Sequence, residues 1–175
     1  MPTRIGIWLP IFGAWLRNVP DEGMDWSFAY NARIAKLADR LGFETILVAE
    51  LNLNDISGHD APVLEAWTTI AALAAITERI RLMAAVRPGY RLPQIVAKMS
   101  ANIDHISGGR FELNLVSAWW RQEMEMYTGA WLDHQERYRR SAEFARVMKG
   151  MWTHTPFDFA GEFYRAQNAV LSPKP

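Results

Sequence analysis

The side chains with the greatest capacity for chemistry gather between Arg110 and Glu125, a stretch that reads RFELNLVSAWWRQEME. Residues 111–117 alternate apolar and polar side chains and then become apolar, which is typical of a strand covered on one face by a helix. Asn114 on this strand, two tryptophans at its end and Glu123 one turn later are more polar and aromatic material than a core strand needs. Because α/β folds place their chemistry at the carboxyl ends of strands, the stretch is a candidate binding site. The alternative is structural, with Asn114 hydrogen-bonded in the core and the tryptophans filling a gap.

The elements that must position these residues follow from hydrophobic periodicity along the chain. Buried strands are expected over residues 4–11, 45–50, 81–87 and 111–117, and helices over residues 26–41, 64–77, 93–106, about 118–127 and 135–152. Ser117 is a candidate N-cap for the fourth helix, and residues 13–23 read as a loop. A small hairpin that turns at Ala160-Gly161 is expected near the C-terminal end.

Helical spacing also predicts which side chains face inward. These residues are Tyr30, Ile34, Leu37, Ala38 and Leu41 in the first helix, Ile95, Met99, Ile103 and Ile106 in the third, and Tyr138, Ala142, Ala145, Met148 and Trp152 in the last.

Strands that alternate with helices four times imply an α/β fold with parallel pairing, because each crossover must return beside its parent strand. Each βα unit takes roughly 35 to 40 residues, as in a (β/α)8 barrel. The sequence therefore predicts the N-terminal half of a TIM barrel, a single domain over residues 1–175 that stops before barrel strand five. The alternative is a complete four-stranded open sheet, whose exposed strand edge would need covering.

Composition excludes several classes of function. Nineteen basic residues balance nineteen acidic ones, so no net charge would attract nucleic acid or an anionic membrane. The chain has no cysteine, and its four histidines lie far apart, so no metal site is expected. The sequence contains no apolar run of membrane-spanning length and none of the glycine-rich nucleotide motifs, and a cytoplasmic protein is the simplest interpretation.

Several blocks resemble the bacterial luciferase-like flavin-dependent monooxygenase superfamily: LADRLGFETILVAE, PQIVAKMSANIDHISGGRFELNLVSAWW and LDHQERYRRSAEFARVMKGMW. The combination of SGGRFxLNLVS with a later HxERY is the most specific part. The resemblance is greatest to the branch that holds alkanesulfonate and dimethylsulfide monooxygenases and pyrimidine oxygenase. It implies a (β/α)8 barrel with the flavin at the carboxyl ends of the strands.

The resemblance also implies cofactor and partners: reduced FMN (FMNH2), O2, a small organic sulfur or nitrogen compound as substrate, and a separate NAD(P)H-dependent flavin reductase. A homo-oligomer is expected as well. Carried over by position, Glu50 and Leu51 would be walls beside the flavin ring, and Asn114 would bond a polar edge of the flavin. Glu123 would bond a flavin hydroxyl or amide, while Arg137 and Tyr138 would flank the ribityl and phosphate side.

Other interpretations stay open at this point. Glu50 could cap the next loop, Arg137 could be a solvated helix residue paired with Glu136 or Asp133, and Tyr138 could belong to the core. The catalytic residues of the superfamily are expected beyond Pro175, so none is assigned here. Two further functions compete: a coenzyme F420-dependent hydride-transfer oxidoreductase of the same superfamily, and a non-catalytic truncated half-barrel.

Overall fold

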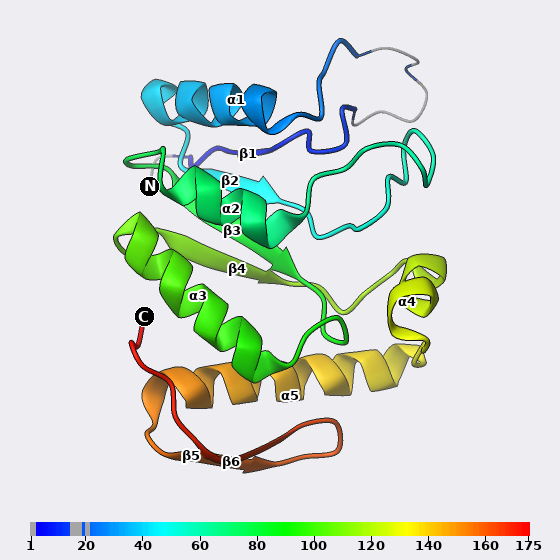
Figure 1. Ribbon diagram of the computed structural model, residues 1–175, viewed down its shortest axis with the longest axis vertical. Coiled ribbons are helices and arrows are strands. Elements are labelled where there is room, and N and C mark those ends of the chain that lie inside the picture. The colour runs from blue at the N-terminus through cyan, green and yellow to red at the C-terminus, as the bar shows by residue number, and fades with distance from the viewer. Residues whose placement is uncertain (1–2, 15–18, 20–21) are drawn as a thin grey trace. The chain divides into compact units, whose positions relative to one another are not determined.

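A computed structural model describes residues 3–14, 19 and 22–175, and the loop expected over residues 13–23 lies partly outside this range. The elements follow in the order shown in Figure 1. They are β1 (Gly6–Trp8), α1 (Phe28–Leu41), β2 (Thr45–Val48), α2 (Ala66–Ala74), β3 (Arg81–Val86), α3 (Pro93–Ser107), β4 (Phe111–Leu115), α4 (Arg121–Thr128), α5 (His134–Thr153), β5 (Phe157–Ala160) and β6 (Arg165–Ala169). Every expected strand and helix is therefore present, most with shorter bounds than expected.

The chain divides into two compact units: Met1–Ala85 with Ile106–Asn114, and Val86–His105 with Leu115–Pro175. The first unit contains α1, α2 and, apart from the last residues of β3 and β4, a sheet of strand order β1-β2-β3-β4. Strands β1, β2 and β3 pair in parallel, as the alternation of strands and helices predicts. The prediction of an α/β fold with a parallel sheet is confirmed.

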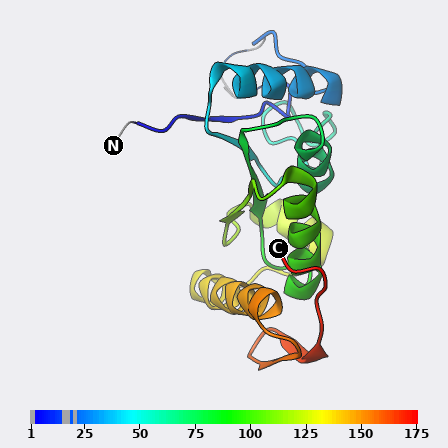
Figure 2. The same cartoon turned by 90° about the vertical axis from the view of Figure 1, so that its left-hand side faces the viewer.

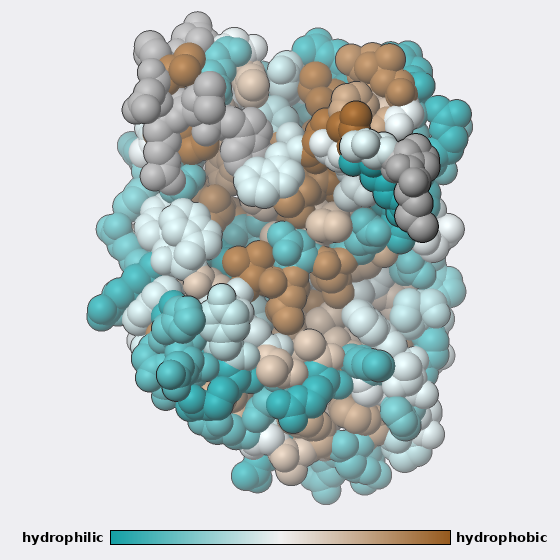
Figure 3. All heavy atoms as spheres, turned by 180° about the vertical axis from the view of Figure 1, so that it is seen from behind, coloured by the Kyte–Doolittle hydropathy of each residue, from teal (hydrophilic) through white to brown (hydrophobic). Residues whose placement is uncertain are grey.

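The sheet has apolar side chains on both faces. Ile46 and Val48 of β2 are fully buried, as are their register partners Leu82 and Ala84 of β3. Successive side chains of a strand point to opposite faces, so Leu47 lies on the other face, where it is only half-buried. Figure 2 shows α2 on one side of the sheet, and Figure 3 shows the opposite side, where apolar residues (brown) reach the surface.

The buried side of α1 consists mainly of small residues, so the prediction that Leu37 and Leu41 face inward is wrong. Ala35 and Ala38 are buried together with Asn31 and Asp39, whereas Leu37 and Leu41 are exposed by 41% and 67%. Alanines let the helix backbone approach its neighbours closely, and the larger side chains are left at the flanks. Gly42 ends the helix in the left-handed conformation with φ of 82°, as expected for a C-terminal glycine.

Asp39 ties α1 to the segment that leads into β3. Its carboxylate accepts backbone hydrogen bonds from Glu78 (2.7 Å), Arg79 (3.2 Å) and Ile80 (3.0 Å). Burial alone would raise the pKa of this carboxyl, but the backbone hydrogen bonds outweigh it and hold the pKa below its ordinary value of 3.8. The start of β3 therefore depends on an ionised side chain 42 residues earlier in the chain than Arg81.

In the second unit, Glu143 of α5 plays the same part for the hairpin of β5 and β6. Its carboxylate accepts backbone hydrogen bonds from Glu162 (2.8 Å), Phe163 (2.9 Å) and Tyr164 (3.2 Å) in the turn. Burial opposes ionisation, but these bonds prevail and lower the pKa of Glu143. The hairpin expected from the sequence is thus present and is anchored to α5.

The inward stripes predicted for α3 and α5 are also wrong in part. In α3, Ile103 is buried as expected, but Ile95 and Ile106 are exposed by 53% and 43%. In α5, Met148 is buried as expected, while Ala142 and Ala145 are exposed. The buried side of α5 instead consists of Ser141, Glu143, Phe144, Val147, Met148, Gly150 and Met151.

We expect Asp39→Ala to lower the free energy of unfolding by about 1.5–3 kcal/mol near neutral pH, because buried backbone N–H groups lose an ionised acceptor. Since the folded pKa is lowered, this contribution is complete above the ordinary value of 3.8 and is lost as the pH falls through the folded value. Urea unfolding at about pH 7 and about pH 2.5 measures the loss of unfolding free energy and its dependence on pH. The exposed Asp60→Ala variant is the control, and an equal deficit for Asp39→Ala at both pH values would contradict the assignment.

Candidate functional site

Three of the predicted residues lie at the carboxyl ends of β2 and β4 in the first unit. Glu50 and Leu51 follow β2 after one intervening residue and are buried, with 4% and 7% of their surface exposed. Asn114 is the fourth of the five residues of β4. These positions agree with the expectation that polar side chains collect where parallel strands end.

Asn114 lies on the face of the sheet opposite α2. Phe111 of β4 packs on the buried Trp67 of α2, with ring centroids 5.8 Å apart. By alternation, Asn114 points the other way, to the face shared with Leu47. Its side chain is half-buried and has no hydrogen-bonding partner in the part of the chain that the structure describes. The structural interpretation, an amide satisfied within the core, therefore lacks its hydrogen bond.

A buried ion pair joins the loop after β3 to α4 in the second unit. The Arg87 guanidinium donates through Nη1 to Glu123 Oε2, and the Tyr90 hydroxyl donates to the same oxygen at 3.0 Å. Arg87 and Glu123 are exposed by only 2% and 0%. The guanidinium also lies over the Tyr90 ring, 4.6 Å from its centroid. Glu123, predicted to bond a flavin, is thus first of all the anion that neutralises Arg87.

The sequence did not reveal this pair. Arg87 is one of the largest fully buried side chains of the described chain, an unusual place for a charged residue. In the sequence, the pair shows only as a cation after β3 and an anion 36 residues later on α4. Many other oppositely charged residues have similar separations, so this spacing does not predict an ion pair.

The helix after β4 begins later than expected. Ala118 has φ of 62°, a left-handed conformation that a non-glycine residue adopts rarely and that cannot continue into a right-handed helix. The helix α4 therefore starts at Arg121, and its N-cap is Trp120 rather than Ser117. Trp119 stacks on Trp120 with ring centroids 5.8 Å apart and is 55% exposed, so this part of the chain presents aromatic surface.

Arg137, in the first turn of α5, binds backbone rather than carboxylates. It donates to the carbonyls of Ser117 (3.2 Å) and Leu132 (2.8 Å), and its guanidinium lies 4.1 Å from the centroid of the Trp131 ring. The alternative pairing with Glu136 or Asp133 is not found, because those two residues form a capping box at the start of α5. Arg137 thus fixes the segment between β4 and α5.

Tyr138 does not belong to the core stripe on which the sequence placed it. It is 57% exposed, and its ring lies 4.8 Å from that of His134. Although Arg137 and Tyr138 are adjacent in the chain, their side chains contact different neighbours. Tyr138 is therefore available to a ligand, whereas its neighbour is engaged with the backbone.

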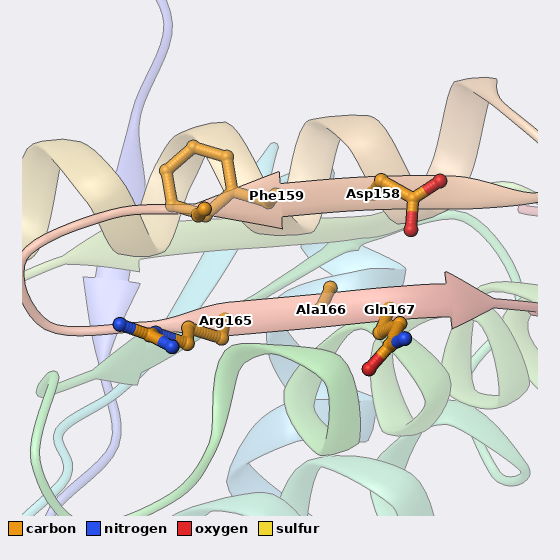
Figure 4. Close-up of a pocket in the computed structure, with 6 residues that line it drawn as sticks. Asp158, Phe159, Arg165, Ala166 and Gln167 are labelled. Atoms are coloured by element: carbon orange, nitrogen blue, oxygen red, sulfur yellow. The ribbon is translucent and has the colours of Figure 1, made fainter.

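A pocket lies on the hairpin of β5 and β6, and its lining includes none of the predicted flavin residues (Figure 4). It is lined by Asp158, Phe159, Ala160, Arg165, Ala166 and Gln167. The Asp158 carboxylate already accepts a hydrogen bond from the Asn168 backbone at 2.8 Å. We therefore do not assign flavin binding to this pocket.

Two classes of site find no support within the described ranges. No group of three or more histidine, aspartate or glutamate side chains there could hold a metal ion. Likewise, none of the helices described is both long enough and apolar enough to cross a membrane.

Comparison with known proteins shows which family the chain resembles. The model for the family "Luciferase-like monooxygenase" matches residues 3–175. FMNH(2)-dependent dimethylsulfone monooxygenase from Pseudomonas putida is 38% identical over 176 residues, covering 99% of this chain and 48% of the relative. Pyrimidine monooxygenase RutA from Allorhizobium ampelinum is 32% identical over 182 residues, covering 99% of this chain and 48% of that relative. The chain spans about half the length of the curated relatives it matches.

A solved structure adds evidence on the fold. An F420-dependent secondary alcohol dehydrogenase in complex with an F420-acetone adduct superposes with a TM-score of 0.83 over 100% of this chain and 50% of that one. At 22% sequence identity this likeness concerns the fold alone.

We expect Arg87→Met to lower the free energy of unfolding by about 3–5 kcal/mol, because it leaves Glu123 as a buried charge without its guanidinium. Arg87→Met combined with Glu123→Met should recover much of that loss, since an apolar pair replaces an ionic one. Denaturant unfolding of both variants measures the effect.

The exposed pair Arg121–Glu125, spaced i to i+4 on α4, provides the matched control. Arg121→Met should cost about 0.3–0.5 kcal/mol. Equal losses for Arg87→Met and Arg121→Met would show that the buried pair contributes no more than a surface one.

Proposed function

Since the chain belongs to the luciferase-like monooxygenase family, we propose that it forms the N-terminal half of the (β/α)8 barrel of a flavin-dependent monooxygenase that uses reduced FMN and O2. Two relatives named for different substrates, the dimethylsulfone and the pyrimidine monooxygenase, support the proposal that the activity is that of a monooxygenase. Residues 1–175 are proposed to be one luciferase-like domain that stops before barrel strand five.

The half-barrel proposal is supported by the sheet itself. A closed parallel barrel fills its interior with apolar side chains, whereas an open sheet with one helical layer would be expected to present polar groups on the other face. Here Trp8, Leu47 and Met83 lie in register on the face opposite α2, toward the carboxyl ends of the strands, whereas Thr45 and Arg81 lie at the other end of that face. Trp8, on the edge strand β1, is 58% exposed. Such a face is suited to further barrel strands.

Asn114 is the observation that carries the flavin proposal. Its half-buried amide has no partner within the described residues and lies near the carboxyl end of β4, on the apolar face of the sheet. An amide can donate and accept at once, which matches the alternating polar edge of an isoalloxazine, and the apolar side chains of this face suit the ring. The residues present therefore fit the cofactor. Reduced FMN, when bound, supplies the electrons needed to activate O2.

The other predicted residues take supporting roles in this proposal. Glu50 and Leu51 would form walls beside the flavin ring, and Tyr138 together with Arg137 would flank its ribityl and phosphate side. Glu123 would bond a flavin hydroxyl or amide through a carboxylate that Arg87 and Tyr90 hold in place. No catalytic residue is assigned.

The substrate is proposed to be a small organic sulfur or nitrogen compound, by analogy with the sulfone and the pyrimidine named for the relatives. A separate NAD(P)H-dependent reductase would supply the reduced flavin. We further propose a cytoplasmic homo-oligomer, which would cover part of the apolar surface that the described residues leave exposed.

We expect Asn114→Leu to weaken FMN binding by about 1–3 kcal/mol, because a buried polar edge of the ring would lose its hydrogen bonds. A fluorescence titration with FMN measures the affinity, and Asn102→Leu on the exposed side of α3 is the control. Unchanged affinity for Asn114→Leu, accompanied by lost stability, would assign Asn114 to packing instead.

A parallel titration with reduced coenzyme F420 tests the competing enzyme class. We expect reduced FMN to bind at least as tightly as reduced F420, since the FMNH(2)-dependent relative from Pseudomonas putida is 38% identical to this chain. Preference for F420 would favour hydride transfer, and a chain that binds neither would favour a non-catalytic half-barrel.

A further inference from the structure

Arg140, in the second turn of α5, is a cation without an anion. Its guanidinium makes no hydrogen bond or ion pair with any residue that the structure describes, and its Nε atom is buried. The neighbouring carboxylates are engaged elsewhere, since Glu143 accepts the backbone N–H groups of the hairpin turn and Glu162 pairs with Arg139. A partly desolvated guanidinium with no counter-charge is costly, so a binding role is the natural explanation.

A second donor without a partner belongs to the hairpin turn that is bound by Glu143, one helical turn after Arg140. The Tyr164 side chain is 8% exposed, and its hydroxyl has no hydrogen-bond partner in the described chain. The ring is held edge-on against the buried Phe144, with centroids 5.8 Å apart. Burial raises the pKa of Tyr164 to about 12, while the charge of the nearby Arg140 acts in the opposite direction. The hydroxyl therefore remains a protonated donor at physiological pH and feels the charge of the guanidinium.

The backbone after β3 passes close to the Arg140 guanidinium. Gly89 has φ of 113°, and a Cβ atom added there would lie 2.9 Å from Arg140 Nη1 and 2.8 Å from the Met124 methyl group. Only glycine leaves this space to the guanidinium. Burial lowers the pKa of Arg140, Tyr164 acts in the opposite direction, and the positive charge of Arg137 adds to the lowering. A guanidinium nevertheless stays protonated in proteins. The site is thus closely packed and positively charged.

From these orphan donors we propose that Arg140 and Tyr164 bind a small oxyanion such as sulfate or phosphate. Such an anion offers several acceptor oxygens to the planar guanidinium and to the phenol at once, and its charge balances Arg140. A metal cation would be repelled, and water would satisfy the hydroxyl but leave the charge uncompensated. The proposal does not rest on the flavin contacts proposed above, because neither donor is among them.

Isothermal titration calorimetry with sodium sulfate, at ionic strength matched with sodium chloride, tests the proposal. We expect saturable binding to the wild-type chain, weakened at least about tenfold in Arg140→Gln and by a smaller factor in Tyr164→Phe. Arg139→Gln, which removes the adjacent exposed arginine, should leave the affinity unchanged. Absence of saturable binding to the wild type, or equal weakening by Arg139→Gln and Arg140→Gln, would overturn the proposal.

Thermal unfolding provides a readout that does not depend on Arg140→Gln folding. Without sulfate, Tyr164→Phe should be as stable as the wild type or more stable, because it removes a hydroxyl that has no partner. With sulfate, the wild type should gain more stability than Tyr164→Phe. If Tyr164→Phe is less stable without sulfate and gains as much from it as the wild type, the hydroxyl does not face an anion site.

Repeating the titration with FMN and with riboflavin identifies the source of the anion. Competition between sulfate and FMN, but not riboflavin, would support the site with the flavin phosphate as its ligand. Sulfate binding that is indifferent to both flavins would support a site for a free anion.

Discussion

A parallel sheet with apolar side chains on both faces needs two covers, and this requirement governs the first unit. Helix α2 lies on one face, where Ile46, Val48, Leu82 and Ala84 are fully buried. The other face carries Trp8, Leu47 and Met83 in register, more exposed than the first set. Burial of such a face is strongly favourable in water. This uncovered apolar face is therefore the reason for proposing that further barrel strands cover it.

Buried carboxylates hold the connections between elements. Asp39 binds the backbone that leads into β3, Glu143 binds the turn between β5 and β6, and Glu123 neutralises Arg87 after β3. Each of these anions has its partners within the chain. Asn114 and Arg140, which have no side-chain partners among the described residues, stand out against this pattern and are the groups to which we assign ligands.

The order and type of the elements could be predicted because each depends on local patterns. Apolar runs such as TILV and RLMAAV became β2 and β3, and Pro93 and Gly42 mark helix ends as expected. The buried sides of α1, α3 and α5 could not be predicted from hydrophobicity alone. Close packing selects small residues for the nearest approach, so Ala35, Ala97 and Gly150 are buried while Leu37 and Ile95 are not.

The candidate site, too, could be predicted only in part from the sequence. Sequence was sufficient to place Glu50, Leu51 and Asn114 at strand ends, because a strand's end and its side-chain alternation are local properties. Only the tertiary structure could show that Glu123 pairs with Arg87, that Tyr138 is exposed and that Arg140 has no counter-charge. The reason is that the partner of a charged group is decided by which distant segments fold together, and spacing along the chain does not contain that information.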